Sequence, residues 1–272
     1  MNAFFEYDFL QRALIAAVLV GFAAPLVGVF LVQRRLALLG DGMGHVALTG
    51  IGLSMVLGSA PLPTAMVAAA IGALIVEFIR SRSRTAGDLA LALVFYGGIA
   101  GGVVLASAAD SGSANLTQYL FGSITTVTST DLKALAVLVL AIAVTLAIAG
   151  RSIWLISLDE DVAKVQGVRV MASSALLTVL AAVVVVVGMR VVGILLVSAL
   201  MIIPVAAAQQ VTRSFRATMI GGVVVGVISA MTGLLASYTL DVAPGGMIVV
   251  VALTVFTLSA ITGTTLRRVR RS

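Results

Sequence analysis

Long apolar segments follow one another along almost the whole chain, and this feature leaves few folds open to it. Of 272 residues, 61% are hydrophobic and only 10% are charged, whereas a typical soluble domain has about 25% charged residues. A helix crosses the hydrocarbon core of a bilayer with about 20 apolar residues. Because such segments use up the chain, the sequence predicts one all-α integral membrane domain over residues 1–272, with no separate soluble domain.

Nine apolar runs are candidates for membrane-spanning helices. We leave the segment Leu116–Thr130 uncounted, because its serine and threonine content suits an interfacial or re-entrant segment. Only Met189 and Arg190 separate two of the runs, which predicts a tight hairpin there, and eight spans remain an alternative if that pair is miscounted. The predicted fold is a polytopic bundle of about eight or nine helices, formed from Ala13–Val32, Gly44–Leu57, Ala65–Ile79, Leu89–Ala109, Ala134–Ala149, Met171–Gly188, Val191–Ala208, Thr218–Ala236 and Met247–Leu266.

The basic residues predict how the bundle is oriented. With nine spans and the N-terminus outside, fourteen of the seventeen Lys and Arg residues fall on the cytoplasmic side, as the positive-inside rule requires. We therefore expect an N-out, C-in topology. The net charge of +6 reflects these cytoplasmic loops beside the membrane lipid, so it does not indicate a nucleic-acid partner. Met1–Gln11 has no basic residue, so we expect the first apolar run to be retained instead of cleaved as a signal peptide.

Asp41 and His45 form the most distinctive polar pair in the apolar sequence. His45 is the only histidine of the chain, and residues four apart lie on one face of a helix. A carboxylate and an imidazole on one face can both bind a divalent metal. The alternatives are that Asp41 caps a helix or pairs with Arg34 or Arg35, and that His45 is an ordinary packed side chain.

Several absences limit the chemistry that the chain can perform. It has no cysteine, which excludes thiolate metal sites, and no Gly-Lys dipeptide, which excludes the common phosphate-binding loop of ATPases. With a single histidine, most kinds of acid–base enzyme are not expected, so we expect no enzymatic activity. Nearly every charge lies at the end of an apolar run, whereas ion-gradient carriers keep ionisable residues inside their spans. A transporter of this composition is therefore expected to depend on a separate ATPase.

The longest polar interruption, within about residues 151–170, is a candidate contact for such an ATPase. Ser157 and Glu160 have the spacing of a helix capping box, the acidic residues suit a helix N-terminus, and Gly167 suits its C′ position. A short surface helix is predicted. It could equally be a connector that lies on the membrane.

The chain resembles the permease subunits of the zinc, manganese and iron ABC importers, the metal ABC-3 group. The resemblance runs nearly from end to end and rests on several ordered motifs. They are Pro25–Arg35, Leu39-Gly40-Asp41 with His45, Gly87-Asp88-Leu89, Tyr119–Ile124, Asp159–Gly167 and Gly193–Pro204.

The resemblance implies a permease homodimer in the inner membrane of a bacterium. Two copies of a cytoplasmic ATPase would drive it with ATP, and an extracytoplasmic metal-binding protein would deliver Zn²⁺, Mn²⁺ or Fe²⁺ as cargo, with no permanently bound cofactor. Asp41 and His45 match metal-pathway residues of the family, and two protomers would bring two of each to the dimer axis. The matching ATPase coupling residues are Asp159, Glu160, Asp161, Ala163, Lys164 and Gly167.

The site departs from the family pattern at Gly42 and Gly44, where small residues and then serine are usual. Each glycine weakens a helix by about 1 kcal/mol relative to alanine. The position of Asp41 close behind Arg34 and Arg35 leaves two locations open: the pair guards a cytoplasmic exit, or the chain re-enters and carries it towards the middle of the membrane.

Three other functions remain alternatives at this stage. One is a permease for a metal chelate such as a siderophore or a corrinoid, and another is a gradient-driven metal carrier. The third is a membrane scaffold without transport. Glu77, Asp88 and Asp241 could be secondary metal ligands, but their places at the ends of runs favour solvation or pairing with arginines.

Overall fold

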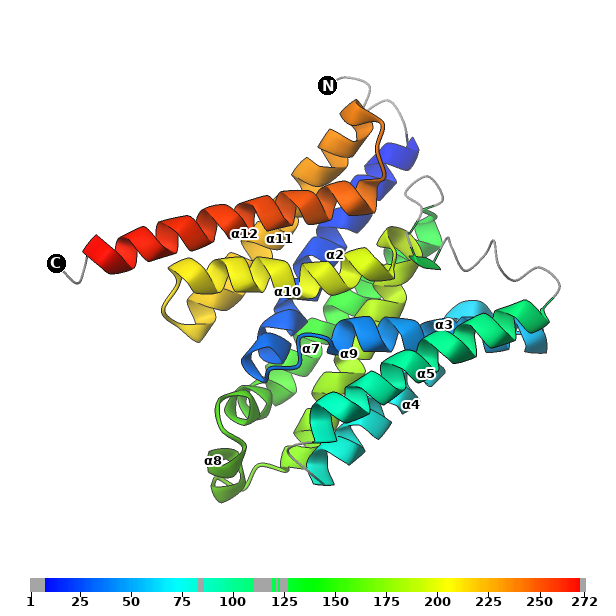
Figure 1. Cartoon of the computed structure of the whole chain (residues 1–272), viewed down its shortest axis with the longest axis horizontal. Coiled ribbons are helices and arrows are strands. Elements are labelled where there is room, and N and C mark those ends of the chain that lie inside the picture. Colours follow the sequence, from blue (N-terminus) through cyan, green and yellow to red (C-terminus); the bar gives the residue numbers. More distant parts are fainter. Residues whose placement is uncertain (1–7, 83–85, 110–118, 121, 123–126, 270–272) are drawn as a thin grey trace.

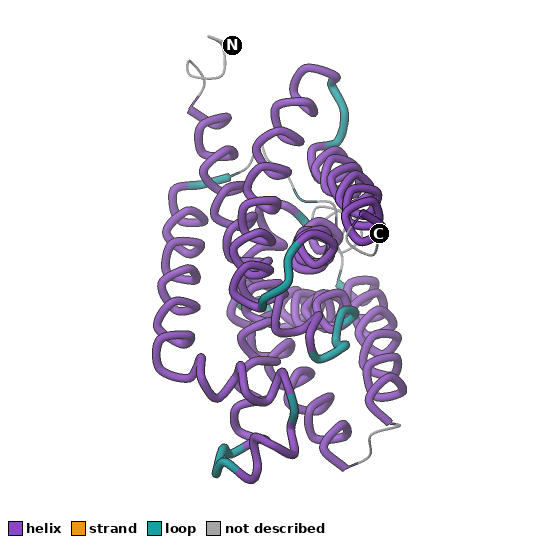
Figure 2. Tube along the Cα trace, turned by 90° about the vertical axis from the view of Figure 1, so that its left-hand side faces the viewer, coloured by secondary structure: helices purple, strands orange, loops and turns teal. Residues whose placement is uncertain are grey.

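The computed structural model describes residues 8–82, 86–109, 119–120, 122 and 127–269, with side chains at all of these except 86–88 and 265–269. The regular structure within those ranges is helical (Figures 1 and 2), which confirms the predicted all-α class. The helices are α2 (Asp8–Gln33), α3 (Leu39–Leu57), α4 (Pro61–Arg82), α5 (Ala86–Ala108), α7 (Ser129–Leu158), α8 (Glu160–Val165), α9 (Val170–Val192), α10 (Ile194–Val211), α11 (Phe215–Leu240) and α12 (Pro244–Val269).

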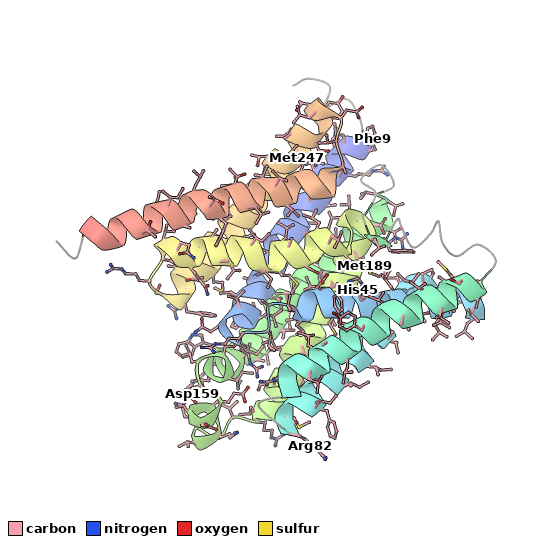
Figure 3. The ribbon with its side chains drawn as sticks, in the orientation of Figure 1. Phe9, His45, Arg82, Asp159, Met189 and Met247 are labelled. Carbon is pink, nitrogen blue, oxygen red and sulfur yellow. The ribbon has the colours of Figure 1, made fainter. Side chains whose placement is uncertain are left out.

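Eight of the described helices are long and apolar enough to cross a membrane. The long helix α3 is not among these eight. Asp41, His45 and the glycines of α3 lower its hydropathy. We interpret α3 as a further pass, from the path of the chain before and after it. Phe9 at the start of α2 and Arg82 at the end of α4 lie at opposite ends of the molecule (Figure 3), so α2, α3 and α4 together make an odd number of passes. Nine passes would require such an odd number here, and both the count of nine and the N-out orientation stay predictions beside the eight candidate spans.

Helices α2 and α9 form the centre of the bundle. They are the most buried of the apolar helices, and α9 is buried all round at Val184, Val185 and Val186. A helix that is apolar on every face belongs inside a larger bundle. Helix α9 contacts α2, α3, α4, α7 and α10, so α3, which carries Asp41 and His45, and α10 both pack against this inner helix.

The break between α9 and α10 lies at Gly193 and not at Met189 and Arg190. Gly193 has a φ of +84°, which glycine adopts at little cost, and α9 and α10 then run in different directions (Figure 1). The two runs are thus separate helices, and the predicted turn was placed three residues too early. Arg190 remains inside α9, where its Nε donates to Asp131 Oδ1 of α7 at 2.8 Å.

Most of the uncounted segment Leu116–Thr130 lies outside the described residues, as do the side chains of Gly87-Asp88 and part of the motif Tyr119–Ile124. The described Gly122 lies against the break between α9 and α10, where an added Cβ would come within 2.4 Å of the carbonyl carbon of Val192. This contact explains the glycine. It also ties the motif to the start of α10.

Candidate functional site

The first turns of α3 place Asp41 and His45 on one helix face. Helix α2 ends after Gln33, and the chain turns with Arg35 at a φ of +59°. The Leu36 N–H then donates to the Leu31 carbonyl at 2.8 Å, in the hydrogen-bond pattern of a Schellman ending. Only five residues separate the two helices, so the chain reverses sharply and α3 begins at Leu39.

Glycines on α3 and α5 let the neighbouring helices approach this turn closely. A Cβ at Gly44 would lie 2.3 Å from Ile194 Cγ2 of α10, and a Cβ at Gly98 of α5 would lie 2.8 Å from the backbone carbon of His45. Helix α5 therefore packs on the main chain of the histidine itself. The glycines that weaken α3 as an isolated helix are the ones that permit its packing, since small residues let helices approach in membranes.

The two candidate ligands face each other at a distance suited to a shared ion. His45 Nε2 lies 3.8 Å from Asp41 Oδ1, and their side chains are 12% and 29% exposed. This separation is too long for a hydrogen bond. The ring of Phe95 stands edge-on to the imidazole, with centroids 4.5 Å apart, and this contact restricts the histidine to its present orientation.

The pair lies deep in the molecule and opens onto a cavity. Figure 3 shows His45 near the centre of the bundle, whereas Asp159 and Arg82 lie together at one end. This place in the bundle favours the second of the two locations left open by the sequence, towards the middle of the membrane, which stays a prediction. A cavity of about 300 Å³ lies beside Asp41, with a mainly apolar lining of Leu38, Leu91, Ala92, Phe95 and Tyr96.

The simpler explanations for Asp41 do not fit the structure. The N-cap of α3 is Leu38, without a side-chain cap, and Arg34 bonds to Glu160 instead. His45 Nδ1 is buried without a hydrogen-bond partner, as is Ser198 Oγ of α10. Among the described residues, no group of three or more His, Cys, Asp or Glu side chains could hold a metal. One protomer therefore supplies two such ligands at this position.

The predicted short helix is present as α8 (Glu160–Val165), but its cap differs from the prediction. Asp159 Oδ1 accepts hydrogen bonds from the N–H groups of Asp161 and Val162 at 2.8 and 3.1 Å. Ser157 does not form the expected capping box, because its hydroxyl donates to the Ile153 carbonyl inside α7. Ser157 and Asp159 both have capping chemistry, and α7 continues through the first of them to Leu158. Gly167, with a φ of +78°, has the expected C′ conformation.

The six predicted coupling residues divide into a buried and an exposed group. Ala163 is fully buried, and Glu160 points into the bundle towards two arginines. Asp161 and Lys164 form an exposed ion pair of 3.1 Å on the outer side of α8. A partner protein would therefore meet Asp161 and Lys164 first, while Glu160 holds the helix in place.

Glu160 joins α8 to the ends of three long helices. Its Oε1 accepts from Arg34 at the end of α2 and from Arg80 Nη2 of α4, the latter at 2.9 Å. Both arginines also donate to Ser174 Oγ of α9, at 2.6 and 3.0 Å. Burial acts to raise the pKa of Glu160, but the charges and hydrogen bonds of Arg80 and Arg34 outweigh it and lower the pKa from its ordinary value.

The sequence did not identify Arg34, Arg80 and Ser174 as parts of this cluster. Their types suggested only cytoplasmic loops, and nothing in the spacing relates residues 126 positions apart. The signal available was the placement of arginines at the ends of two runs, opposite an acidic segment. Glu77 is buried and paired with Arg80 at 2.9 Å, as expected for its place, and exposed Asp241 ends α11 with a φ of +52°.

Comparisons with known proteins bear on the whole chain. A sequence model described as the ABC 3 transport family matches residues 6–263. The manganese transport system membrane protein MntC of Halalkalibacterium halodurans is 33% identical over 254 residues, which cover 93% of this chain and 87% of that protein. The manganese import system permease protein ScaB of Streptococcus parasanguinis is 32% identical, covering 93% and 90%.

Solved structures share the fold. PsaBC from Streptococcus pneumoniae in complex with a Fab superimposes with a TM-score of 0.84 at 32% identity, covering 95% of this chain and 93% of that one. An inward-facing transporter described as being of the metal-chelate type has a TM-score of 0.73 at 19% identity, covering 93% and 86%. The second likeness bears on the fold alone.

Proposed function

This chain belongs to the ABC 3 transport family, and we propose from that premise that it is the permease of an ATP-driven importer that moves a divalent transition metal inward by alternating access. The relatives MntC and ScaB carry manganese in their names, so Mn²⁺ is the first cargo to test, before Zn²⁺ and Fe²⁺. Carboxylate and imidazole ligands suit Mn²⁺, and the absence of cysteine removes the softer ligands that would favour zinc.

The observation that supports this function is the pair Asp41 and His45 on one face of α3. The Oδ1 atom of Asp41 and the Nε2 atom of His45 lie 3.8 Å apart. His45 is the single histidine of the chain. His45 lies near the middle of the bundle in Figure 3, which supports a site where a bound ion would have left one side of the membrane without reaching the other. Alternating access requires a site with that property.

We further propose that a second copy of the chain completes the site. Transition metals in proteins take four or more ligands, and one protomer offers two here. A twofold axis beside α3 would add a second Asp41 and a second His45, since a symmetric dimer uses the same surface of both subunits. The cargo would then have two oxygen and two nitrogen ligands, and exit would follow when the two copies move apart.

Coupling to the ATPase is assigned to the outer side of α8. Asp161 and Lys164 are exposed there, while Ala163 and Glu160 bind α8 to the bundle. Charge reversal at Asp161, with Asp159 and Glu160 kept because they cap and attach α8, is expected to weaken copurification of the permease with its ATPase. An undisturbed complex would contradict the assignment.

Uptake of radioactive Mn²⁺ by cells that carry Asp41→Asn or His45→Gln tests the cargo site. We expect uptake to fall by about tenfold or more. Mutation of even the residues around a metal's ligands lowers metal affinity or activity by about 10 to 100-fold. The matched control is Asp241→Asn, which makes the same chemical change at an exposed helix end, where asparagine keeps the left-handed conformation. Wild-type uptake by both site variants at normal expression would exclude the proposal.

The same cells separate the alternative cargo. Uptake of free Mn²⁺ with no uptake of a metal chelate supports the metal permease, whereas the reverse result identifies a chelate permease. Activity that persists after deletion of the ATPase would identify a gradient-driven carrier instead.

A further inference from the structure

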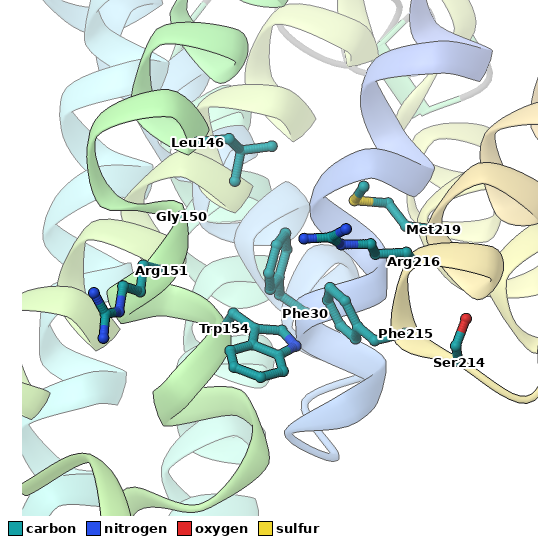
Figure 4. Close-up of a pocket in the computed structure, with 9 residues that line it drawn as sticks. All are labelled: Phe30, Leu146, Gly150, Arg151, Trp154, Ser214, Phe215, Arg216 and Met219. Atoms are coloured by element: carbon teal, nitrogen blue, oxygen red, sulfur yellow. The ribbon is translucent and has the colours of Figure 1, made fainter. Parts of the chain in front are cut away.

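A cavity of about 650 Å³ lies between the ends of α2, α7 and α11, away from Asp41 and His45 (Figure 4). Its volume is within the range of about 300 to 1,000 Å³ that is typical of ligand sites. Neither the cargo site nor the coupling helix contributes a residue to it. The lining residues are Phe30, Leu146, Gly150, Arg151, Trp154, Ser214, Phe215, Arg216 and Met219.

The cavity has an apolar wall and a cationic edge. The rings of Phe30 and Phe215 pack with centroids 5.2 Å apart, and the guanidinium of Arg216 extends from α11 above them towards α7 (Figure 4). Arg151 supplies a second exposed guanidinium from α7. The lining contains no acidic residue. In the part of the chain that the structure describes, neither arginine side chain has an ion pair or a hydrogen bond.

The lining residues come from helix ends that are predicted to face the cytoplasm. Arg216 is the second residue of α11, Arg151 and Trp154 lie in the last turns of α7, and Phe30 lies four residues before Arg34. A tryptophan near the end of a membrane-spanning helix is typical of the boundary between lipid and water. With the predicted orientation, the cavity would open at the level of the headgroups of the inner leaflet.

We propose that this cavity binds an anionic phospholipid. Its acyl chain would lie against the aromatic wall, and its phosphate would pair with the guanidinium of Arg216, while Arg151 adds positive charge at the α7 edge of the cavity (Figure 4). Charge complementarity selects this occupant, because basic pockets between helices at the cytoplasmic surface bind anionic headgroups, and a zwitterionic lipid would leave both guanidinium groups uncompensated. The inference rests on the membrane orientation and does not depend on which cargo the permease carries.

Trp154 makes the site directly observable, because it is the only tryptophan in the chain. The full-length permease is placed in phosphatidylcholine vesicles that contain a small fraction of a brominated lipid. This lipid is either phosphatidylglycerol or phosphatidylcholine, each with brominated acyl chains. Bromine quenches indole fluorescence on contact. We expect stronger quenching by brominated phosphatidylglycerol at equal mole fraction. The preference should fall about fivefold for each arginine removed, in Arg151→Gln, Arg216→Gln and the double variant.

The matched control is Arg213→Gln, which removes the same charge as each single variant from the turn just before α11, outside the lining of this cavity. Preference for phosphatidylglycerol that is lost in the double variant and kept in the control supports the site. Equal quenching by the two lipids in the wild-type protein overturns the proposal without any variant. Loss in the control as well would show a general effect of surface charge, and would also overturn it.

Docking of the ATPase is the competing role for the two arginines, and copurification tests it. A double variant that loses the ATPase but keeps its preference for phosphatidylglycerol would assign the arginines to the ATPase interface and overturn the lipid site. Normal copurification with a lost lipid preference supports it.

Discussion

Gly98 is the residue on which the packing around His45 depends most directly. A Cβ there would meet Val46 N at 2.7 Å and His45 C at 2.8 Å, and backbone atoms cannot rotate away as a side chain can. We expect Gly98→Ala to push α5 off α3 and to lower the free energy of unfolding by about 1 to 3 kcal/mol, as overpacking does. The loss of stability is measured as a lower melting temperature in detergent, which is determined by size-exclusion chromatography.

The adjacent Gly97 is the control for that change. A Cβ there would meet nothing within 4 Å, so Gly97→Ala should leave the melting temperature unchanged or raise it slightly, since alanine is the better helix former. Equal melting temperatures for Gly98→Ala and wild type would show that α5 does not lie on the His45 backbone as described.

At the residue scale the sequence identified the pair but not its surroundings. A spacing of four on a helix was enough to predict that Asp41 and His45 face each other, because helix geometry is local. Phe95 and Ser198 come from other helices, and no periodicity in the sequence relates them to residue 45. The Ser157 cap was wrong for a similar reason: several nearby residues can cap a helix, and the packing of α7 decides which one does.

Glu160 is the charged side chain that attaches the short helix α8 to the bundle, beside the buried Ala163. Glu160→Gln removes the negative charge that lies between Arg34 and Arg80, and leaves both guanidinium groups partly buried beside each other. We expect faster backbone hydrogen exchange in α8 of this variant, with α9 and α10 unchanged. Asp161→Asn is the control, because its pair with Lys164 is exposed and exposed pairs contribute little. Equal exchange in the two variants would contradict the attachment.

The same carboxylate predicts how the attachment depends on pH. The pKa of Glu160 is lowered in the folded protein, so the ion pairs stabilise the docked helix above the pKa of an ordinary glutamate and are lost as the pH falls through the lowered value. Protection of α8, corrected for intrinsic exchange, should therefore persist at neutral pH and fall only in acid. Glu160→Gln should show no such step, and a step in that variant would assign the effect to another group.

The passage of the chain through the membrane can be tested by labelling, because the chain has no cysteine. Val242→Cys lies in the exposed turn between α11 and α12, and Lys164→Cys lies on the exposed side of α8. With the predicted N-out topology, a membrane-impermeant maleimide should label the first in intact cells. It should label the second only after permeabilisation. The opposite pattern would invert the orientation.

For the whole molecule, composition and run length were enough to predict the helical class and a bundle of about eight or nine long apolar helices. Their reliability comes from the bilayer, which forces each span to satisfy its own backbone. The turn at Gly193 and the central depth of His45 were not predictable in the same way. Both depend on how helices cross inside the bundle, and apolar runs look alike whether they face lipid or protein.

The low hydropathy of α3 also affects how the protein is made. Eight helices are apolar enough to enter the bilayer one by one as they leave the ribosome, but α3 carries Asp41 near its start, and such a residue costs about 2.5 to 3.5 kcal/mol at the middle of a membrane. We expect residues 39–57 to stay outside the lipid until α5 has been synthesised and can cover them through Gly98 and Gly102. Glycosylation reporters on nascent chains that stop before or after α5 would time this step. The polar pair therefore changes the order in which the helices enter the bilayer. Helix α3 would enter after α4 and together with α5, although it precedes both in the sequence.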